Sequence, residues 1–261
     1  MEGFRMPTVD QLYKYLDSKF PDTLRCDWDN DGLMVADDPD REVMRVLCTL
    51  DVTEDAVDYA IANNFDVIVS HHPMIFRPLK AVNYAEPIAK KTMKLLKNGI
   101  SVMSFHTRLD AASGGLNDIF AKLMGLSDIG TITMDGEPIG RIGTIPTPLA
   151  CSDFASGAKK ALGAERILYA SASGIVNRLA ICGGDGKDFI KAAKAAGADS
   201  YLTGQLSYNI MNESDYIGMN LFEAGHFHTE DFICSYLTLL ILKEFTNVKT
   251  GYFNCNRIKS V

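Results

Sequence analysis

The chain has 261 residues, of which 47% are hydrophobic and 23% are charged. This composition is typical of a folded globular protein and excludes a largely disordered one. A chain of this length can form one large domain or two modest ones, with a core that needs no disulfide or metal to hold it together. The 33 acidic residues outnumber the 26 basic ones, the formal net charge is −7, and no long basic run is present. We therefore expect no nucleic acid among the partners of this protein.

The expected location is the cytoplasm. The first ten residues are polar and partly acidic, unlike a signal peptide, and the longest apolar stretches are too short to cross a bilayer, so no membrane association is expected. The six cysteines form no C-x-x-C pair. This spacing predicts buried free thiols in a reducing compartment, and it excludes a cysteine-held zinc ion and an iron–sulfur cluster.

Apolar spacing and capping residues predict a first series of alternating helices and strands. A polar loop over 26–35 leads into a short strand, Thr53 is the expected cap of one helix, and Gly99 ends another. The predicted helices cover 7–20, 53–63, 86–98 and 117–124, and the predicted strands cover 43–50, 65–70 and 100–105.

A second series follows the turn-rich stretch 128–140, which is the expected boundary between the two series. The predicted helices cover 151–162 (capped by Ser152), 188–196, 206–214 and 228–245, and the predicted strands cover 141–147, 166–170, 176–182, 200–203 and 220–224. Strands and helices that alternate in this way predict an α/β fold with largely parallel strands.

All five histidines follow predicted strands, in three short segments. The first segment is SHHPMIF, residues 70–76. Neighbouring residues of a strand point to opposite faces, so His71 and His72 can serve one metal ion only if the backbone bends there, as Pro73 favours. Otherwise each imidazole serves a different ion of a pair, or the segment is a polar turn with two exposed histidines.

The second segment, SFHTRLDAASGGLND, places Asp110 four residues after His106. Asp110 offers an oxygen that can bind or bridge divalent cations, or it is an ordinary turn residue. The third segment is EAGHFHTED, in which His226 and Glu230 are four residues apart and share one face if the helix starts early. His228 should then face elsewhere, and Glu230 is alternatively part of the first-turn capping.

Together the segments supply four imidazoles and two carboxylates, more than one tetrahedral zinc site requires. The predicted ligands are His71, His72, His106, Asp110, His226 and Glu230. This set suits two divalent ions, for which zinc, iron, manganese and nickel are all compatible with the mixed ligands. A glycine-rich stretch at 181–186, ICGGDG, either cradles a phosphate at a helix start or is only a tight connection.

The segments HHPMIF, HTRLDAASGGLND, TGQLSYN and GHFHTE resemble, in this order and spacing, the Nif-three-like family, whose members are widely labelled GTP cyclohydrolase I type 2 homologues. The early WDNDGL (28–33) and the middle GRIGTIP (140–146) extend the similarity along the chain. The resemblance implies two α/β lobes with a dinuclear metal site between them. It also implies that the final helix and strand return to the first lobe, so that 1–127 with 223–261 forms the first lobe and 128–222 forms the second.

The resemblance further implies a homohexamer, a trimer of dimers, and a metal-dependent hydrolase that acts on a small, nucleotide-derived molecule. Glu230 and His106 are the residues expected to move protons. If the substrate is GTP, water opens its imidazole ring and formate is released. Two positions depart from the family pattern, since Gln205 stands where members often have glutamate and Asn209 where many have histidine. The alternative is a non-enzymatic metal-binding or regulatory ring protein that interacts with other proteins.

Overall fold

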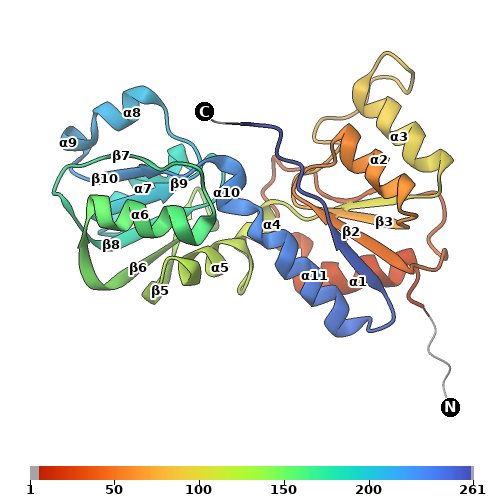
Figure 1. Ribbon diagram of the computed structural model, residues 1–261, viewed down its shortest axis with the longest axis horizontal. Coiled ribbons are helices and arrows are strands. Elements are labelled where there is room, and N and C mark those ends of the chain that lie inside the picture. The colour runs from red at the N-terminus through yellow and green to blue at the C-terminus, as the bar shows by residue number, and fades with distance from the viewer. Residues whose placement is uncertain (1–5, 260–261) are drawn as a thin grey trace. The chain divides into compact units, whose positions relative to one another are not determined.

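The computed structural model describes residues 6–259 (Figure 1). Within these residues, the chain packs as two compact units. The first unit contains residues up to Leu109 and Ile233–Ile258, and the second contains Asp110–Phe232 with Lys259. The second unit therefore includes residues 110–127 and 223–232, which the family resemblance assigned to the first lobe. No helix of the described residues is both long enough and apolar enough to cross a membrane.

The first unit is built on a five-stranded sheet with the order β1-β4-β3-β2-β11. The strands are β1 (Gly32–Val35), β2 (Arg45–Thr49), β3 (Val67–Ser70), β4 (Ser101–Ser104) and β11 (Lys249–Tyr252). Strands β2, β3, β4 and β11 are parallel where they pair, and β1 is antiparallel to β4 at the sheet edge. Residues of β2, β3 and β4 are almost all buried, as expected for parallel strands that are covered on both faces.

Helices cover the two faces of this sheet, as Figure 1 shows. The helices are α1 (Val9–Lys19), α2 (Glu54–Ala62), α3 (Pro87–Lys97) and α11 (Phe232–Glu244), with a short 3-10 turn at Asp22–Leu24. On one face, Val57 of α2 and Leu95 of α3 pack in one core with Ile68 of β3. On the other face, Tyr15 of α1 donates a hydrogen bond to the carbonyl of Leu240 in α11. Thr53 caps α2, as predicted, by accepting the Ala56 amide.

The second unit is built on a six-stranded sheet with the order β5-β6-β8-β9-β10-β7. The strands are β5 (Ser127–Met134), β6 (Glu137–Ala150), β7 (Leu168–Ala170), β8 (Ile175–Cys182), β9 (Ser200–Thr203) and β10 (Asn220–Glu223). Only β8, β9 and β10 pair in parallel, while the β5–β6, β6–β8 and β7–β10 pairs are antiparallel. The expectation of largely parallel strands is thus correct for the first unit and wrong for the second.

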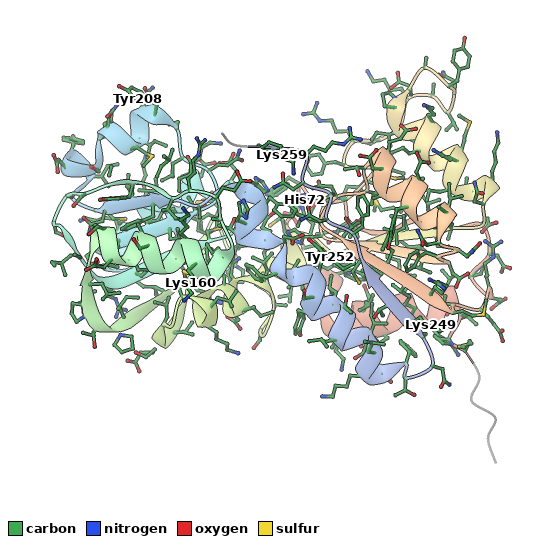
Figure 2. All side chains as sticks on the ribbon, in the orientation of Figure 1. His72, Lys160, Tyr208, Lys249, Tyr252 and Lys259 are labelled. Atoms are coloured by element: carbon green, nitrogen blue, oxygen red, sulfur yellow. The ribbon has the colours of Figure 1, made fainter. Side chains whose placement is uncertain are left out.

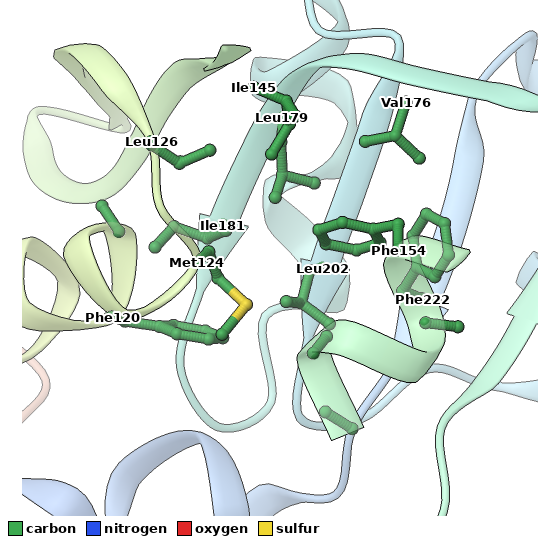
Figure 3. Packing of buried hydrophobic residues seen from close by; sticks show 14 of the residues in the cluster. Phe120, Met124, Leu126, Ile145, Phe154, Val176, Leu179, Ile181, Leu202 and Phe222 are labelled. Atoms are coloured by element: carbon green, nitrogen blue, oxygen red, sulfur yellow. The ribbon is translucent and has the colours of Figure 1, made fainter. Parts of the chain in front are cut away.

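Two helices of the second unit pack on its sheet in one hydrophobic core (Figure 3). Phe120 of α5 and Phe154 of α6 pack against residues of the sheet such as Leu179, Leu202 and Phe222. The helices are α5 (Leu116–Leu123), α6 (Cys151–Leu162), α7 (Ile190–Ala195), α8 (Tyr208–Asn212), α9 (Ser214–Ile217) and α10 (His226–Glu230), with a 3-10 turn at Lys187–Phe189. The short helix α4 (Thr107–Ala111) contains the point at which the chain passes from the first unit to the second.

The stretch 128–140, expected to be a turn-rich boundary, is instead most of a β-hairpin. Asp135 and Gly136 both have positive φ, 52° and 90°, and they connect β5 to β6 as the two residues of a tight turn. Aspartate followed by glycine is a strong signal for such a turn, and it lies in the middle of the supposed boundary.

Two expectations about helices are also wrong. The predicted helix 228–245 begins earlier, at His226, and is divided at Asp231 into α10 and α11. The helix α6 begins one residue before Ser152, and Ala150 precedes it without a side-chain hydrogen bond, so Ser152 does not cap it. The residue at which a helix begins decides which side chains of its first turn share a face. In α10 this matters because the helix begins at His226, one of the predicted ligands.

Candidate metal centre

Three of the predicted ligands follow neighbouring parallel strands of the first unit. His71 and His72 come directly after β3, and His106 comes two residues after β4. The carboxyl ends of parallel strands meet at the same edge of a sheet, where binding residues collect in α/β folds. The sequence therefore brings these imidazoles together through the pairing of β3 with β4.

The three imidazoles form one cluster. Their ring centroids are 5.0 Å apart for His71 and His72, 5.2 Å for His71 and His106, and 5.6 Å for His72 and His106. One ligand atom from each ring lies within 4.8 Å of the others. The tandem histidines share one cluster because β3 ends at Ser70, so the alternation of a strand no longer applies to them. Figure 2 labels His72 on the ribbon.

Each clustered imidazole has its Nδ1 against an oxygen. Nδ1 of His71 lies 2.9 Å from the carbonyl oxygen of Phe105, and Nδ1 of His72 lies 2.8 Å from Oδ1 of Asp51. Nδ1 of His106 lies 2.9 Å from Oδ1 of Asp29. A carbonyl or carboxylate oxygen can only accept, so each Nδ1 carries the proton and each neutral ring presents its lone pair at Nε2. Metal-bound histidines in proteins are oriented in the same way.

The partner of His106 is a buried carboxylate. Asp29 also accepts hydrogen bonds from the amide and the hydroxyl of Thr107, at 3.1 and 2.7 Å. Burial favours the neutral acid, but the bonds from His106 and Thr107 outweigh it and lower the pKa of Asp29 to about 2. Asp29 therefore stays ionised at neutral pH and fixes the ring of His106.

A second buried carboxylate holds the same loop in place. Asp31 accepts the backbone amide of His106 at 2.7 Å and forms an ion pair with Arg108, in which both side chains are fully buried. Arg108 Nη1 also donates to Asp17 at 2.6 Å. Sequence reasoning assigned no role to the acidic residues Asp29, Asp31 and Asp51. For Asp51 a signal existed, because it follows β2 at the same edge of the sheet as the histidines.

A pocket of about 290 Å³ opens beside His72. Its lining includes Asp51, Thr53 and Lys91 in addition to that histidine. Lys91 is half-buried and donates a hydrogen bond to the carbonyl of Val52, and burial lowers its pKa. A cationic and a hydroxyl side chain therefore lie in the pocket beside the histidine cluster.

The second unit repeats the same arrangement with its own parallel strands. The glycine-rich loop follows β8, Gly204-Gln205 follows β9, and His226 follows β10. His226 and Glu230 share one face of α10, with 3.0 Å between Nε2 and Oε2. The expected i, i+4 arrangement is therefore present. Oε1 of Gln205 lies 2.9 Å from Nδ1 of His226, so this amide orients the imidazole.

Asp110 is placed in the second unit, where it is buried with 8% of its surface exposed. Burial raises the pKa of the Cys182 thiol, and the charges of Asp110 and Glu230 raise it further. Both carboxylates therefore lie within electrostatic reach of one thiol at the end of β8. His228 is half-buried, and its ring lies 5.6 Å from that of Phe227.

Three backbone amides of the glycine-rich loop after β8 are already used in hydrogen bonds to side chains of the protein. The amide of Gly183 donates to Asn117 Oδ1, that of Gly184 to Thr229 Oγ1, and that of Gly186 to Thr203 Oγ1, at 2.9 to 3.1 Å. These three bonds favour the tight connection over the phosphate cradle.

Gly184 is required in this loop for two reasons. Its φ is +63°, and a Cβ atom there would run into the Glu230 carboxylate and lie 3.1 Å from Nε2 of His226. The loop backbone therefore lies directly against the His226–Glu230 pair.

The predicted ligands are thus distributed over both units. His71, His72 and His106 cluster in the first unit, and Asp110, His226 and Glu230 belong to the second. The departures Gln205 and Asn209 differ in role, because Gln205 contacts His226 whereas Asn209 is an exposed residue of α8.

Curated proteins similar to this chain carry two kinds of name. A GTP cyclohydrolase 1 type 2 homolog of Lactococcus lactis is 34% identical over 233 residues, which cover 87% of this chain and 89% of that protein. Another from Clostridium perfringens is 30% identical over 229 residues, covering 85% and 86%. Protein NIF3 homolog of Schizosaccharomyces pombe is 30% identical over 254 residues, covering 90% of each chain.

Solved structures show the same fold. A Bacillus cereus protein related to NIF3 superposes with a TM-score of 0.89 at 21% identity, over 98% of this chain and all of that chain. A hypothetical protein of Staphylococcus aureus superposes with a TM-score of 0.87 at 24% identity and the same coverage. The family model described as Duf34/NIF3 (NGG1p interacting factor 3) matches residues 7–257. The chain belongs to this Duf34/NIF3 family.

Proposed function

We propose that this protein binds two divalent cations and acts as a metal-dependent hydrolase on a small, nucleotide-derived molecule. The observation that carries the proposal is the cluster of His71, His72 and His106, in which each Nδ1 faces an oxygen and each Nε2 presents a lone pair. The family relatives named GTP cyclohydrolase 1 type 2 homolog support the substrate class.

The donor set fits divalent transition metals. Imidazole nitrogen and carboxylate oxygen are ligands for zinc, iron, manganese and nickel, and the complete proposed set is His71, His72, His106, Asp110, His226 and Glu230. The geometry of the first unit supports the three-histidine part of this set, while the assignment of the whole set rests on the sequence. Bound divalent ions supply Lewis acidity, which polarises a substrate oxygen or carbonyl and promotes the ionisation of water.

The side chains of the protein have distinct parts in the proposed reaction. Asp29 holds His106 with its proton at Nδ1, and Gln205 does the same for His226. Glu230 is buried, with 4% exposed, and its Oε2 faces His226 Nε2. We assign the transfer of protons from attacking water to the leaving group to Glu230 and His106, because the Glu230 carboxylate lies 3.0 Å from His226 Nε2 and His106 is paired with the Asp29 carboxylate.

The test is hydrolysis of GTP with formate release as the readout. Protein stripped with a chelator should lose turnover, and adding back a divalent cation should restore it. Asp110→Ala should abolish turnover, whereas Arg77→Ala, at an exposed residue of the first unit, should leave it unchanged. Full activity in the presence of chelator contradicts a metal-dependent reaction. Bound metal without turnover on any nucleotide favours the alternative of a non-enzymatic metal-binding or regulatory ring protein.

We propose in addition that the chain assembles as a homohexamer, a trimer of dimers, in the reducing environment of the cytoplasm. The family resemblance supports the assembly, and the burial of all six cysteines supports the reducing compartment. Light scattering on the purified protein measures the assembly directly, and a monomeric mass contradicts it.

A further inference from the structure

The first unit exposes two aromatic side chains beside the histidine cluster. Trp28 is 57% exposed and Phe76 is 42% exposed. Their ring centroids are 6.3 Å apart with an interplanar angle of 66°, and the Trp28 ring lies 6.1 Å from that of His106. Tyr59, by contrast, lies against the buried ring of Phe65, whereas Trp28 and Phe76 lie against each other with both rings partly open to solvent.

Hydrogen bonds hold the backbone on both sides of Trp28. The amide of Cys26 donates to Thr107 Oγ1 at 3.0 Å, and the Asp29 carboxylate accepts from the same threonine. Asn30 donates to the carbonyl of Ile75, which fixes the Trp28 loop to the residue before Phe76. The backbone that carries the indole is therefore held in place before any ligand arrives, which reduces the entropy that binding would cost.

An exposed indole beside a phenyl ring is a surface suited to a flat partner. Aromatic rings prefer offset-stacked or edge-to-face arrangements, and such stacking is tolerant of the exact identity of the ring. We propose that Trp28 and Phe76 form a stacking subsite for a planar heteroaromatic ring of the substrate, next to the histidine cluster. This inference rests on the proposed function, and it makes Trp28 a residue that positions the substrate.

The protein carries its own probe for the test, because Trp28 is its single tryptophan. Guanosine is the ring-bearing ligand, and ribose 5-phosphate is the control that lacks a ring. We expect guanosine to quench the Trp28 fluorescence in a saturable way, in protein with and without added divalent cation, and ribose 5-phosphate to leave it unchanged. Acrylamide should quench Trp28 efficiently in the ligand-free protein.

Calorimetric titration of variants gives the size of the effect. Trp28→Leu should weaken guanosine binding about 5- to 100-fold, the range that loss of one stacked base contact produces. Phe76→Leu, which keeps the tryptophan as a fluorescent probe, should weaken it by a smaller factor. Tyr84→Leu, which removes an aromatic ring that is 88% exposed, is the matched control and should bind guanosine like the wild type.

The stacking subsite is overturned if guanosine gives no saturable quenching, or if folded Trp28→Leu binds it as tightly as the wild type. It is also overturned if Trp28 is shielded from acrylamide, since another copy of the chain would then cover the ring. Metal content separates this inference from the proposed function. If the wild-type protein contains no divalent cation, the hydrolase proposal is wrong. If the protein contains metal but its guanosine binding does not depend on Trp28, only the stacking subsite is wrong.

Discussion

The tautomer of each clustered histidine is set by the oxygen that its Nδ1 faces. For His71 this oxygen belongs to a backbone carbonyl, and for His72 and His106 it belongs to a carboxylate. A carboxylate partner also raises the basicity of the opposite nitrogen. Asp29 is the more strongly held of the two carboxylates, since it is buried and accepts three further contacts from Thr107 and the Asn30 amide.

Replacing the carboxylate of Asp29 should weaken metal binding. Asp29→Asn removes the charge that orients His106, and we expect the affinity for a divalent cation to fall about 10- to 100-fold, as for other lost partners of metal-bound histidines. Titration against a chromophoric chelator measures this affinity. Asp27→Asn changes an exposed carboxylate two residues away and is the matched control. Equal affinities of the two variants would show that Asp29 does not orient a ligand.

A half-buried ion pair, between Asp118 and Arg141, makes stability depend on pH. Burial by itself raises the pKa of Asp118, but the Gly114 amide and the Arg141 guanidinium lower it below its ordinary value. The ionised form is therefore favoured in the folded state, and its contribution is full above the unfolded pKa of about 4. This contribution is lost as the pH falls through the lower folded value.

Asp118→Asn should lower the free energy of unfolding by about 1–2 kcal/mol at pH 7, a modest value because the carboxylate is partly solvent-exposed. The difference from the wild type should shrink below pH 4. Urea titrations at pH 7 and pH 3 measure both values, and Asp128→Asn, at an exposed carboxylate, should change neither. A difference that stays constant down to pH 3 would contradict the lowered pKa.

At the scale of elements, both units place their site residues shortly after the carboxyl ends of parallel strands. Asp51, His71 and His106 follow three parallel strands of the first sheet, and Gly184, Gln205 and His226 follow three parallel strands of the second. The ligand positions were predictable because a histidine directly after an apolar strand is a simple local signal. The acidic partner Asp29 was not, because its pairing with His106 joins residues 77 positions apart.

Two glycines with similar backbone angles allow the effect of backbone strain to be measured apart from the effect of a steric contact near the His226–Glu230 pair. Gly184 and Gly174 have φ of +63° and +79°, but only at Gly184 would a Cβ meet other atoms, namely those of Glu230 and His226. Alanine at either site should cost about 1 kcal/mol of stability from the backbone alone. Gly184→Ala should in addition displace the flexible end of Glu230 and weaken cation binding, whereas Gly174→Ala should not.

Thermal unfolding and chelator competition on both glycine variants measure the two effects. Equal cation affinities would show that the loop does not support the His226–Glu230 pair.

At the scale of the whole molecule, each unit has its own sheet and its own core. The α/β class was predictable from alternating apolar segments, and the return of the last helix and strand, α11 and β11, to the first unit was expected only from the family resemblance. The β5–β6 hairpin was missed because β5 is mostly exposed and lacks a long apolar run. Hydrophobic periodicity finds buried elements well and exposed edge strands poorly.

The burial of all six cysteines predicts chemical inertness of the folded protein. Burial raises the pKa of Cys48 and of Cys255 to about 11, so these thiols stay protonated near neutral pH. A thiol reagent at pH 8 should react slowly with the folded chain. After unfolding, six thiols per chain should react with it. Rapid reaction of any thiol in the folded protein would show that its surroundings open readily.

The metal content of the purified protein tests the central claim most directly. Elemental analysis of chain prepared without chelator should find two divalent cations per chain, as two-metal hydrolytic sites require. A variant with alanine at His71, His72 and His106 should keep its fold by circular dichroism and lose at least one of them. A wild-type protein with no more bound divalent metal than this variant would contradict the account.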